Sequence, residues 1–328
     1  MLDGNTDNMT PKYISIKIPI GQNLIKPFWI LLLCVNFVES CSAQELLPQT
    51  KNTTSWTSQA NLTSQETPMV ITNATVGWNK NLMVDNVPYD LYIPPNYGKV
   101  SEYILPCLLV LPGWNFSRTS WVENTPLVQY AEQYGYALIL PEMEKTLYES
   151  SYYPETTLKW HQLPGGKFIK EQFIPTIQQR HNLLKKGQQN TMLGLSTGGR
   201  GVALIALENP GLFVAGASLS GDFSQENTPT DRLMTAVYGS FSNFPERWQG
   251  KDNPQARVAE WSMPLYLAHG IADDIVPESQ SRLFYQALVE YHGNTIPVKY
   301  NAIQGAGHDY KFWGGQLEEV FKFITHNN

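Results

Sequence analysis

Short apolar runs alternate with helix-patterned stretches over residues 76–328 of this 328-residue chain, and this alternation limits the possible folds more than any other feature. Strands that are buried on both faces of a parallel sheet form such short, nearly continuous runs. The runs occupy residues 108–111, 137–140, 191–193, 214–219, 265–268 and 298–300. The helices expected between them span residues 121–134, 168–184, 199–208, 277–291 and 311–324. This order predicts the α/β class, with a mostly parallel, doubly wound sheet inside a three-layer αβα sandwich.

Two stretches stand outside this alternation. Residues 87–93 alternate in a strand-like way, which favours an antiparallel edge hairpin with the segment near Val76. Residues 142–167 show no clear period, and they lie where doubly wound folds carry substrate-binding loops.

The pentapeptide Gly-Leu-Ser-Thr-Gly over residues 194–198 lies where a predicted strand turns into a predicted helix. A serine hydroxyl is a weak nucleophile, so a catalytic serine must stand exposed beside a base. A tight strand-to-helix turn exposes it, and glycines keep side chains from colliding there. The five letters alone are a weak signal, but the apolar run before them and the small residues after them supply the right context. We predict that Ser196 is a nucleophile; the alternative is an ordinary strand-to-helix turn.

A candidate acid and a candidate base follow Ser196 in the order that this turn motif requires. Asp273 comes after the strand over residues 265–268, at the carboxyl end where catalytic residues of open α/β sheets gather. It would accept the histidine Nδ1–H and stabilise the imidazolium. His308 follows the last predicted strand, on a loop of small residues that can fold over the serine. The three side chains therefore predict a catalytic triad.

Other residues of the same types compete for the acid and base roles. They are Asp222, Asp274, His292 and His326. Asp274 adjoins Asp273, and Asp273 itself is open to a different interpretation, as the cap of the next helix. His292 closes a predicted helix and His326 lies near the C-terminus, which favours His308 as the base. His269 is expected to be structural, beneath the acid loop.

The oxyanion of a tetrahedral intermediate needs N–H donors. One donor is predicted to be the backbone N–H of Thr197, at the start of the helix after Ser196. The other is assigned to the backbone N–H of Trp114, on the loop after the strand over residues 108–111, with the Asn115 side chain as an auxiliary. Aromatic residues on the expected loops either line an apolar acyl or aryl pocket or pack inside the protein. These residues are Trp114, Trp121, Tyr148, Tyr152, Tyr153 and Trp160.

Composition excludes several classes of site. The net charge is -6 and no run of lysine or arginine occurs, so a nucleic-acid partner is not expected. Three cysteines, Cys34, Cys41 and Cys107, make no disulfide framework and show no zinc-binding spacing. We expect neither a metal nor a cofactor.

The front of the chain predicts export. Residues 1–43 read as a leader, because lysines precede an apolar run over residues 28–38 that is too short to span a bilayer comfortably. Cleavage after Ala43 would release a chain that starts at Gln44. The tetrapeptide Val-Glu-Ser-Cys instead resembles a bacterial lipobox, in which Cys41 becomes a lipidated first residue. The expected locations are the periplasm, the exterior, or a membrane to which a lipoprotein is anchored.

Behind the leader, residues 44–75 are rich in serine, threonine, asparagine and glutamine, and they are expected to form a flexible polar linker. Residues 76–328 remain as one catalytic domain. Within it, the stretch from Trp78 to Ile324 resembles the putative esterase family of the α/β-hydrolase superfamily, which includes esterase D (S-formylglutathione hydrolase), feruloyl esterases and mycolyltransferases. The resemblance rests on residues 111–114, 168–177, 194–201, 208–221, 269–277 and 307–308.

The resemblance implies the α/β-hydrolase fold, hydrolysis of a small-molecule ester or thioester without a cofactor, and Ser196, Asp273 and His308 as the triad. Residues 142–167 match none of the family's substrate loops, so the natural substrate stays open. We interpret the chain as a serine carboxylesterase that works through an acyl-enzyme. The alternatives are an acyltransferase on the same fold and a non-catalytic binding protein, although a binding protein has no need of an intact triad.

Overall fold

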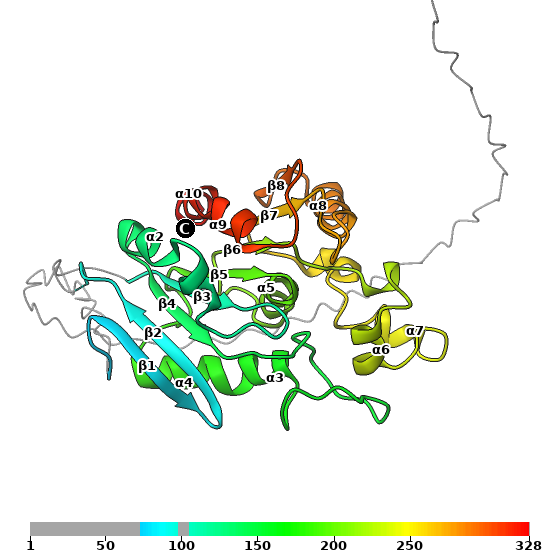
Figure 1. Cartoon of the computed structure of the whole chain (residues 1–328), viewed down its shortest axis with the longest axis horizontal. Coiled ribbons are helices and arrows are strands. Elements are labelled where there is room, and N and C mark those ends of the chain that lie inside the picture. The colour runs from blue at the N-terminus through cyan, green and yellow to red at the C-terminus, as the bar shows by residue number, and fades with distance from the viewer. Residues whose placement is uncertain (1–72, 98–104, 328) are drawn as a thin grey trace, which may run out of the picture. The chain divides into compact units, whose positions relative to one another are not determined.

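An eight-stranded sheet crosses the centre of the protein (Figure 1). The computed structural model describes residues 73–97 and 105–327, so the predicted leader and most of the predicted linker lie outside the described residues. The strands are β1 (Gly77–Val84), β2 (Val87–Ile93), β3 (Cys107–Leu111), β4 (Ala137–Pro141), β5 (Asn190–Leu195), β6 (Ala215–Leu219), β7 (Leu265–Gly270) and β8 (Val298–Ile303). Their order is β1-β2-β4-β3-β5-β6-β7-β8. β2 pairs antiparallel with β1 and with β4, and the other neighbouring pairs among these strands are parallel, which confirms the mostly parallel sheet and the edge hairpin.

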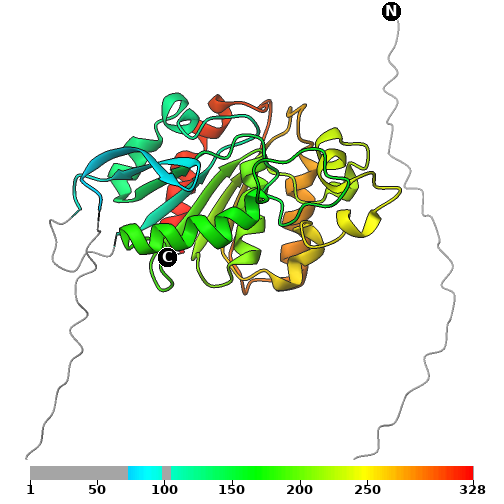
Figure 2. The ribbon, with the colours of Figure 1, turned by 90° about the horizontal axis from the view of Figure 1, so that it is seen from below.

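Side chains of the central strands alternate between two helical layers. Leu108 and Val110 of β3 pack with one layer, and Leu109 and Leu111 pack with the other. The first layer consists of α1 (Ser120–Asn124), α2 (Leu127–Tyr134), α9 (Tyr310–Gly315) and α10 (Leu317–His326). The second consists of α3 (Gly165–Phe168), the π-helix η1 (Ile169–Phe173), α4 (Ile174–His181), α5 (Thr197–Glu208) and α8 (Ser279–His292). Figure 2 shows helices on both sides of the sheet, as the predicted three-layer sandwich requires.

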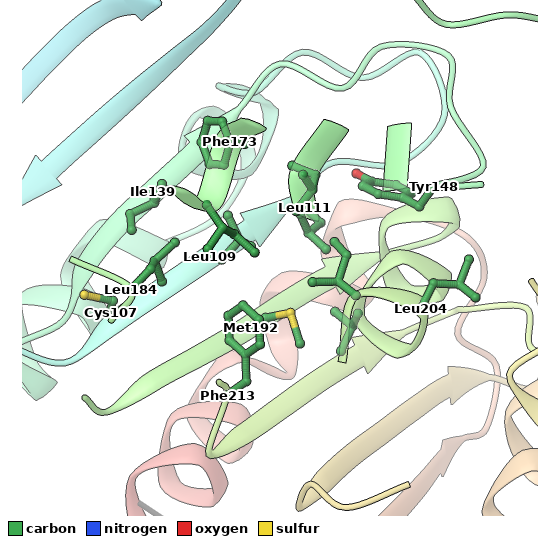
Figure 3. Close-up of a cluster of buried hydrophobic side chains, with 14 of the residues drawn as sticks. Cys107, Leu109, Leu111, Ile139, Tyr148, Phe173, Leu184, Met192, Leu204 and Phe213 are labelled. Carbon is green, nitrogen blue, oxygen red and sulfur yellow. The ribbon is translucent and has the colours of Figure 1, made fainter. Parts of the chain in front are cut away.

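The second layer encloses the larger apolar core. Figure 3 shows Leu109 and Met192 of the sheet with Phe173 of η1 and Leu204 of α5. Each of these four side chains is at most 2% exposed. Burying a side chain of this size contributes about 1.5–3 kcal/mol, so this core fixes α5 and the turn before it on the sheet.

Two predicted helices are broken in the structure. Residues 121–134 form α1 and α2, because Pro126 has no N–H to continue a helix and Thr125 before it is extended. Residues 311–324 fall into α9, which ends at Gly315, and α10, which begins at Leu317. Glycines lower the stability of a helix interior, which accounts for the break.

The helix predicted over residues 168–184 has different ends and an irregular middle. It begins at Gly165 and ends at His181, where Asn182 takes the left-handed conformation with a φ of 58°. The π-helix η1 comes just before Pro175, which cannot donate a hydrogen bond to the preceding turn. Within the described residues, every helix is too short or too polar to span a membrane.

Residues 220–264 hold four short helical elements that the sequence did not predict. They are η2 (Gln225–Asn227), α6 (Arg232–Tyr238), α7 (Pro245–Trp248) and η3 (Gln255–Glu260). The irregular loop over residues 142–160 joins them: the N–H of Thr157 donates to the carbonyl of Ala236 at 2.8 Å. The two segments share a small apolar cluster made of Leu147, Met234, Val237, Tyr238 and Trp248. We call residues 142–160 and 220–264 the lateral lobe.

Candidate active site

Ser196 occupies the sharp turn between β5 and α5. Its φ of 53° and ψ of −125° are strained for a residue with a side chain. The turn is held from both sides, because the Ser196 N–H donates to the carbonyl of Leu219 at 2.9 Å and the Ser196 carbonyl accepts from the N–H of Arg200 at 3.2 Å. A strand-to-helix turn of this shape presents the serine side chain at the carboxyl edge of the sheet.

The glycines of the predicted turn are required by space. A Cβ on Gly194 would lie 2.1 Å from the carbonyl oxygen of Gly198, and a Cβ on Gly198 would lie 2.4 Å from the carbonyl oxygen of Leu111. Both contacts are with backbone atoms, which cannot move aside easily. The sequence-based explanation of these two glycines is therefore confirmed.

His308 and Asp273 meet at the carboxyl edge of the sheet. His308 Nδ1 lies 2.7 Å from Asp273 Oδ2, and the Asp273 side chain is completely buried. Asp273 Oδ1 accepts the N–H groups of Ile275 at 3.0 Å and Val276 at 2.8 Å. Burial alone would raise the pKa of Asp273, but hydrogen bonds from His269, His308 and the Val276 amide outweigh burial and hold that pKa well below its usual range.

The competing residues are engaged elsewhere. Asp222 Oδ2 pairs with Arg200 Nη1 at 3.0 Å, and Asp274 is exposed. His292 Nε2 lies 2.7 Å from the carbonyl of Val258, and His326 Nδ1 lies 3.1 Å from a carbonyl of its own helix. Of the candidate pairs, the structure thus brings together His308 and Asp273.

Trp313 links the His308 loop to the serine turn. Its ring meets the His308 ring edge-on, with centroids 5.0 Å apart, and its Nε1–H donates to Ser220 Oγ at 3.1 Å. Ser220 directly follows Leu219, whose carbonyl holds the Ser196 N–H. The hydrogen bonds of the described residues include none between Ser196 Oγ and His308. Such a bond is often long before a ligand binds, and the triad as a whole stays a prediction.

The two predicted oxyanion donors lie on segments that pack together. Thr197 is the first residue of α5, and among the described residues neither its N–H nor that of Trp114 donates to a backbone carbonyl. The loop of Trp114 lies against the serine, because a Cβ on Gly113 would come within 3.1 Å of Ser196 Cβ. The N–H of Asn115 donates to the carbonyl of Glu144 at 2.8 Å. The oxyanion assignment stays a prediction.

Three of the six aromatic residues that either line a pocket or pack inside the protein are buried: Trp121, Tyr148 and Trp160. Trp121 is completely buried and its Nε1–H donates to the carbonyl of Leu111. Tyr148 is also buried; its hydroxyl donates to the carbonyl of Pro112 at 2.8 Å. Trp114 and Tyr153 are half-buried and pack against the apolar cluster of the lateral lobe.

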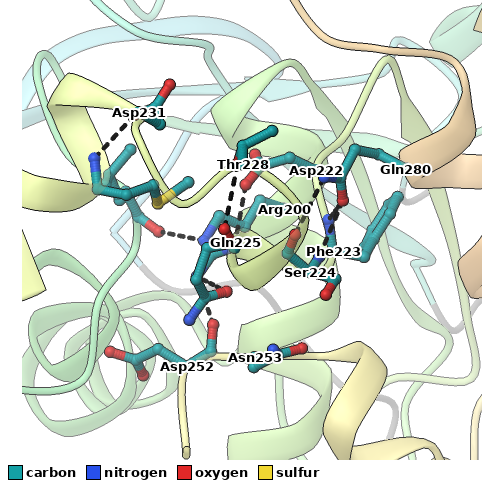
Figure 4. A network of polar contacts seen from close by, with 12 residues as sticks. Arg200, Asp222, Phe223, Ser224, Gln225, Thr228, Asp231, Asp252, Asn253 and Gln280 are labelled. Atoms are coloured by element: carbon teal, nitrogen blue, oxygen red, sulfur yellow. Dashed lines mark hydrogen bonds and ion pairs between the residues drawn. The ribbon is translucent and has the colours of Figure 1, made fainter. Parts of the chain in front are cut away.

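Arg200 is a site residue that the sequence analysis missed. Its guanidinium is completely buried and fastens the lateral lobe to α5 (Figure 4). Nη1 pairs with Asp222, Nε donates to the carbonyl of Leu147 at 3.3 Å, and Nη2 donates to the carbonyl of Asp252. Nη2 also donates to the Tyr238 hydroxyl at 3.3 Å. The one signal in the sequence was an arginine among the glycines that follow the serine turn.

Residues 81–324 match the family model described as Putative esterase. The chain belongs to this family. It is 24% identical over 246 residues to acetylxylan esterase A of Emericella nidulans, an alignment that covers 72% of this chain and 78% of the relative. It is 22% identical over 257 residues to a diacylglycerol acyltransferase/mycolyltransferase of Mycobacterium intracellulare, covering 68% and 74%.

An S-formylglutathione hydrolase from Agrobacterium tumefaciens has a similar structure, with a TM-score of 0.62, 17% identity, and coverage of 79% of this chain and 99% of that one. This likeness shows the α/β-hydrolase fold. The family match makes the chain a carboxylic ester hydrolase of the serine esterase type. Within residues 73–97 and 105–327, no cluster of three histidine, cysteine, aspartate or glutamate side chains could hold a metal ion.

Proposed function

We propose that this protein is a carboxylesterase that forms an acyl-enzyme on Ser196. His308 takes the proton of Ser196 as the hydroxyl attacks the ester carbonyl, and Asp273 stabilises the imidazolium that results. The N–H groups of Trp114 and Thr197 receive the oxyanion. The imidazolium then returns its proton to the leaving alcohol, and a water that His308 activates releases the acid.

One observation carries the proposal: the 2.7 Å contact of His308 Nδ1 with the buried Asp273, at the edge where the strained Ser196 turn lies. The test is labelling of the purified protein by a fluorophosphonate, with peptide mass spectrometry to locate the adduct. We expect the adduct on Ser196, and we expect Ser196→Ala to abolish labelling and ester hydrolysis while the melting temperature stays the same. An adduct elsewhere, or hydrolysis by the variant at the parent's rate, refutes the proposal.

An acyltransferase is the second candidate, and it is favoured by the relative from Mycobacterium intracellulare, whose name describes acyl transfer. Half-buried Trp114 and Tyr153 could shelter an alcohol that competes with water for the acyl-enzyme. Product analysis of p-nitrophenyl ester turnover with a competing alcohol separates the two functions. A hydrolase gives mainly free acid, whereas a transferase gives mainly the new ester.

We also propose that the chain is exported, on the basis of the predicted leader in residues 1–43. Mass spectrometry of the native protein should find either an unmodified start at Gln44 or a lipidated start at Cys41. Recovery of the intact leader on the cytoplasmic protein would refute both outcomes.

A further inference from the structure

A second histidine, which is completely buried, contacts Asp273. His269 is the residue before Gly270 at the end of β7, and its side chain is completely buried. Its Nε2 lies 3.3 Å from Asp273 Oδ2 and 2.9 Å from the carbonyl of Val276, and its Nδ1 lies 2.7 Å from Ser281 Oγ on α8. The imidazole therefore connects the acid loop to two regular elements of the fold.

These contacts decide where the proton of His269 resides. The Val276 carbonyl can only accept, so Nε2 must carry a hydrogen. Nδ1 can then accept the hydroxyl hydrogen of Ser281. In this tautomer the Nε2–H donates to the Val276 carbonyl, and the same nitrogen lies 3.3 Å from Asp273 Oδ2, the oxygen that His308 already contacts. The polar N–H edge of His269 therefore lies beside the carboxylate.

Both oxygens of Asp273 are consequently fixed. Oδ1 accepts two backbone N–H groups, and Oδ2 faces His308 on one side and His269 on the other. His308 is partly exposed and must change its protonation during turnover, so it cannot hold the carboxylate still by itself. His269 belongs to β7, and its buried side chain is held against α8 by Ser281, so it can do so.

We propose that His269 is a positioning residue that fixes Asp273 Oδ2 toward His308 and shares its negative charge; this inference rests on the proposed function. The effect on catalysis is indirect, because His269 touches the acid and neither Ser196 nor the reacting atoms. When the Nε2–H is absent, the charge on Oδ2 is compensated by His308 alone. Protonated His308 is then favoured, so the base becomes available only at higher pH.

The other charged groups near the acid loop are occupied. Asp309 Oδ1 accepts the N–H of Phe312 at the start of α9, and Asp274 is exposed. Glu278, the residue before α8, accepts from Arg282 at 3.2 Å and from the hydroxyl of Tyr300. Among the described residues, the groups that contact the Asp273 carboxylate are thus the two imidazoles and the two amides.

Two amide variants of His269 separate positioning from packing. A glutamine amide nitrogen reaches as far as the imidazole Nε2, whereas an asparagine amide reaches only as far as Nδ1. We expect His269→Asn to lower kcat/KM for p-nitrophenyl acetate about 10- to 100-fold and to move the acid limb of the pH profile to higher pH. His269→Gln should keep kcat/KM and the position of the acid limb close to those of the parent protein. If the two variants match the parent, or if both lose activity with the acid limb unmoved, the inference is wrong.

A matched control is His181→Asn, because His181 is also a buried histidine but lies on α4, where its Nε2 contacts the Tyr89 hydroxyl at 2.7 Å. It should leave the pH profile unmoved. If His269→Asn fails to fold, Ser281→Ala takes its place: it removes the hydroxyl that anchors the His269 imidazole through Nδ1, so Nε2 is held less firmly beside Asp273 Oδ2, and an unmoved acid limb then refutes the inference. Fluorophosphonate labelling of the parent tests the proposed function independently of these variants.

Discussion

At the scale of single residues, Ser196 shows how much the surrounding backbone determines. Its positive φ costs on the order of 1–3 kcal/mol and persists only because neighbouring segments impose it. The Leu219 carbonyl accepts the N–H of Ser196. The Leu111 carbonyl lies so close to the first turn of α5 that position 198 has no space for a side chain. The strain therefore comes from the packing of three strands around one turn.

The crowding at Gly198 gives a first prediction. In Gly198→Ala the new Cβ would meet the Leu111 carbonyl at 2.4 Å and the Pro112 carbonyl at 2.6 Å, so the turn must shift. We expect the free energy of unfolding in urea to fall by about 1–3 kcal/mol and ester hydrolysis to fall with it. The control is Gly315→Ala, where a Cβ meets nothing within 4 Å. Equal behaviour of the two variants would contradict the prediction.

A second prediction concerns the acid of the proposed triad. Asp273→Asn should reduce kcat by about 10⁴-fold, because an amide favours the wrong histidine tautomer and cannot stabilise the imidazolium. Asp274→Asn changes an exposed neighbour and should leave kcat near the parent's. Steady-state kinetics on both variants decide the assignment. A large loss in the Asp274 variant alone would reverse it.

The same carboxylate predicts a pH dependence of stability. Because the pKa of Asp273 is depressed in the folded state, its contribution to stability is present above the unfolded-state pKa of about 3.9 and is lost as the pH falls below it. The gap in unfolding free energy between the parent and Asp273→Asn should therefore narrow as the solution is acidified from neutral pH toward pH 3. Urea titrations at several pH values measure the gap, and a constant gap would count against the depressed pKa.

The sequence indicated some of these residues and could not indicate others. Ser196, Asp273 and His308 were found because a turn motif and chain order limit the choices. The contacts of Arg200 were not assigned, because its partners lie on segments far along the chain. His269 was placed beneath the acid loop, but its partners were not assigned, because the irregular backbone after β7 decides which atoms its imidazole contacts. Hydrogen bonds between distant segments leave no periodic pattern in a sequence.

At the scale of elements, α5 joins the serine turn to the lateral lobe. Arg200 lies one turn after Ser196 and points its guanidinium between loop carbonyls and buried acids. Burial raises the pKa of Asp222 and of Asp252, although the positive charge of Arg200 opposes both increases. The positive charge of Arg200 therefore favours the charged form of Asp222, whereas the charged form of Asp252 is favoured first by hydrogen bonds from Ser150 and then by Arg200.

A prediction follows for this element. Arg200→Met leaves buried carboxylates without a cation, which typically costs about 3–5 kcal/mol. Arg200→Lys should rescue little, because an ammonium group cannot reach several partners in one plane. Urea unfolding measures both losses. The control is Glu155→Gln, which removes an exposed partner of Arg247 and should leave the free energy of unfolding nearly unchanged.

The sequence predicted the central strands and α5 better than the outer helices. Continuous apolar runs mark buried strands, and α5 carries small and apolar residues on nearly every face because it is buried all round. The helix breaks at Pro126 and Gly315 fall inside stretches where apolar residues keep a helical spacing on both sides of the break. This spacing therefore predicted one continuous helix in each stretch. The lateral lobe was missed because its short helices have too few turns to show a period.

At the scale of the whole molecule, the lateral lobe depends on the sandwich. Its apolar cluster is too small to support independent folding, and Arg200 reaches it from α5. Backbone bonds such as the one from Thr157 to Ala236 join its two segments. The lobe should therefore be ordered whenever the sandwich is folded, and the half-buried side chains of its own Tyr153 and of the neighbouring Trp114 should keep one arrangement.

Hydrogen exchange followed by mass spectrometry tests this dependence. In the parent protein, peptides from α6 should be protected nearly as long as peptides from β5, because opening the lobe exposes the charges that Arg200 pairs. In Arg200→Met the α6 peptides should exchange much faster while the β5 peptides keep most of their protection. Fast exchange of α6 in the parent would show that the lobe opens independently. Equal acceleration of both peptides in the variant would show that Arg200 stabilises the sandwich as a whole rather than the attachment of the lobe.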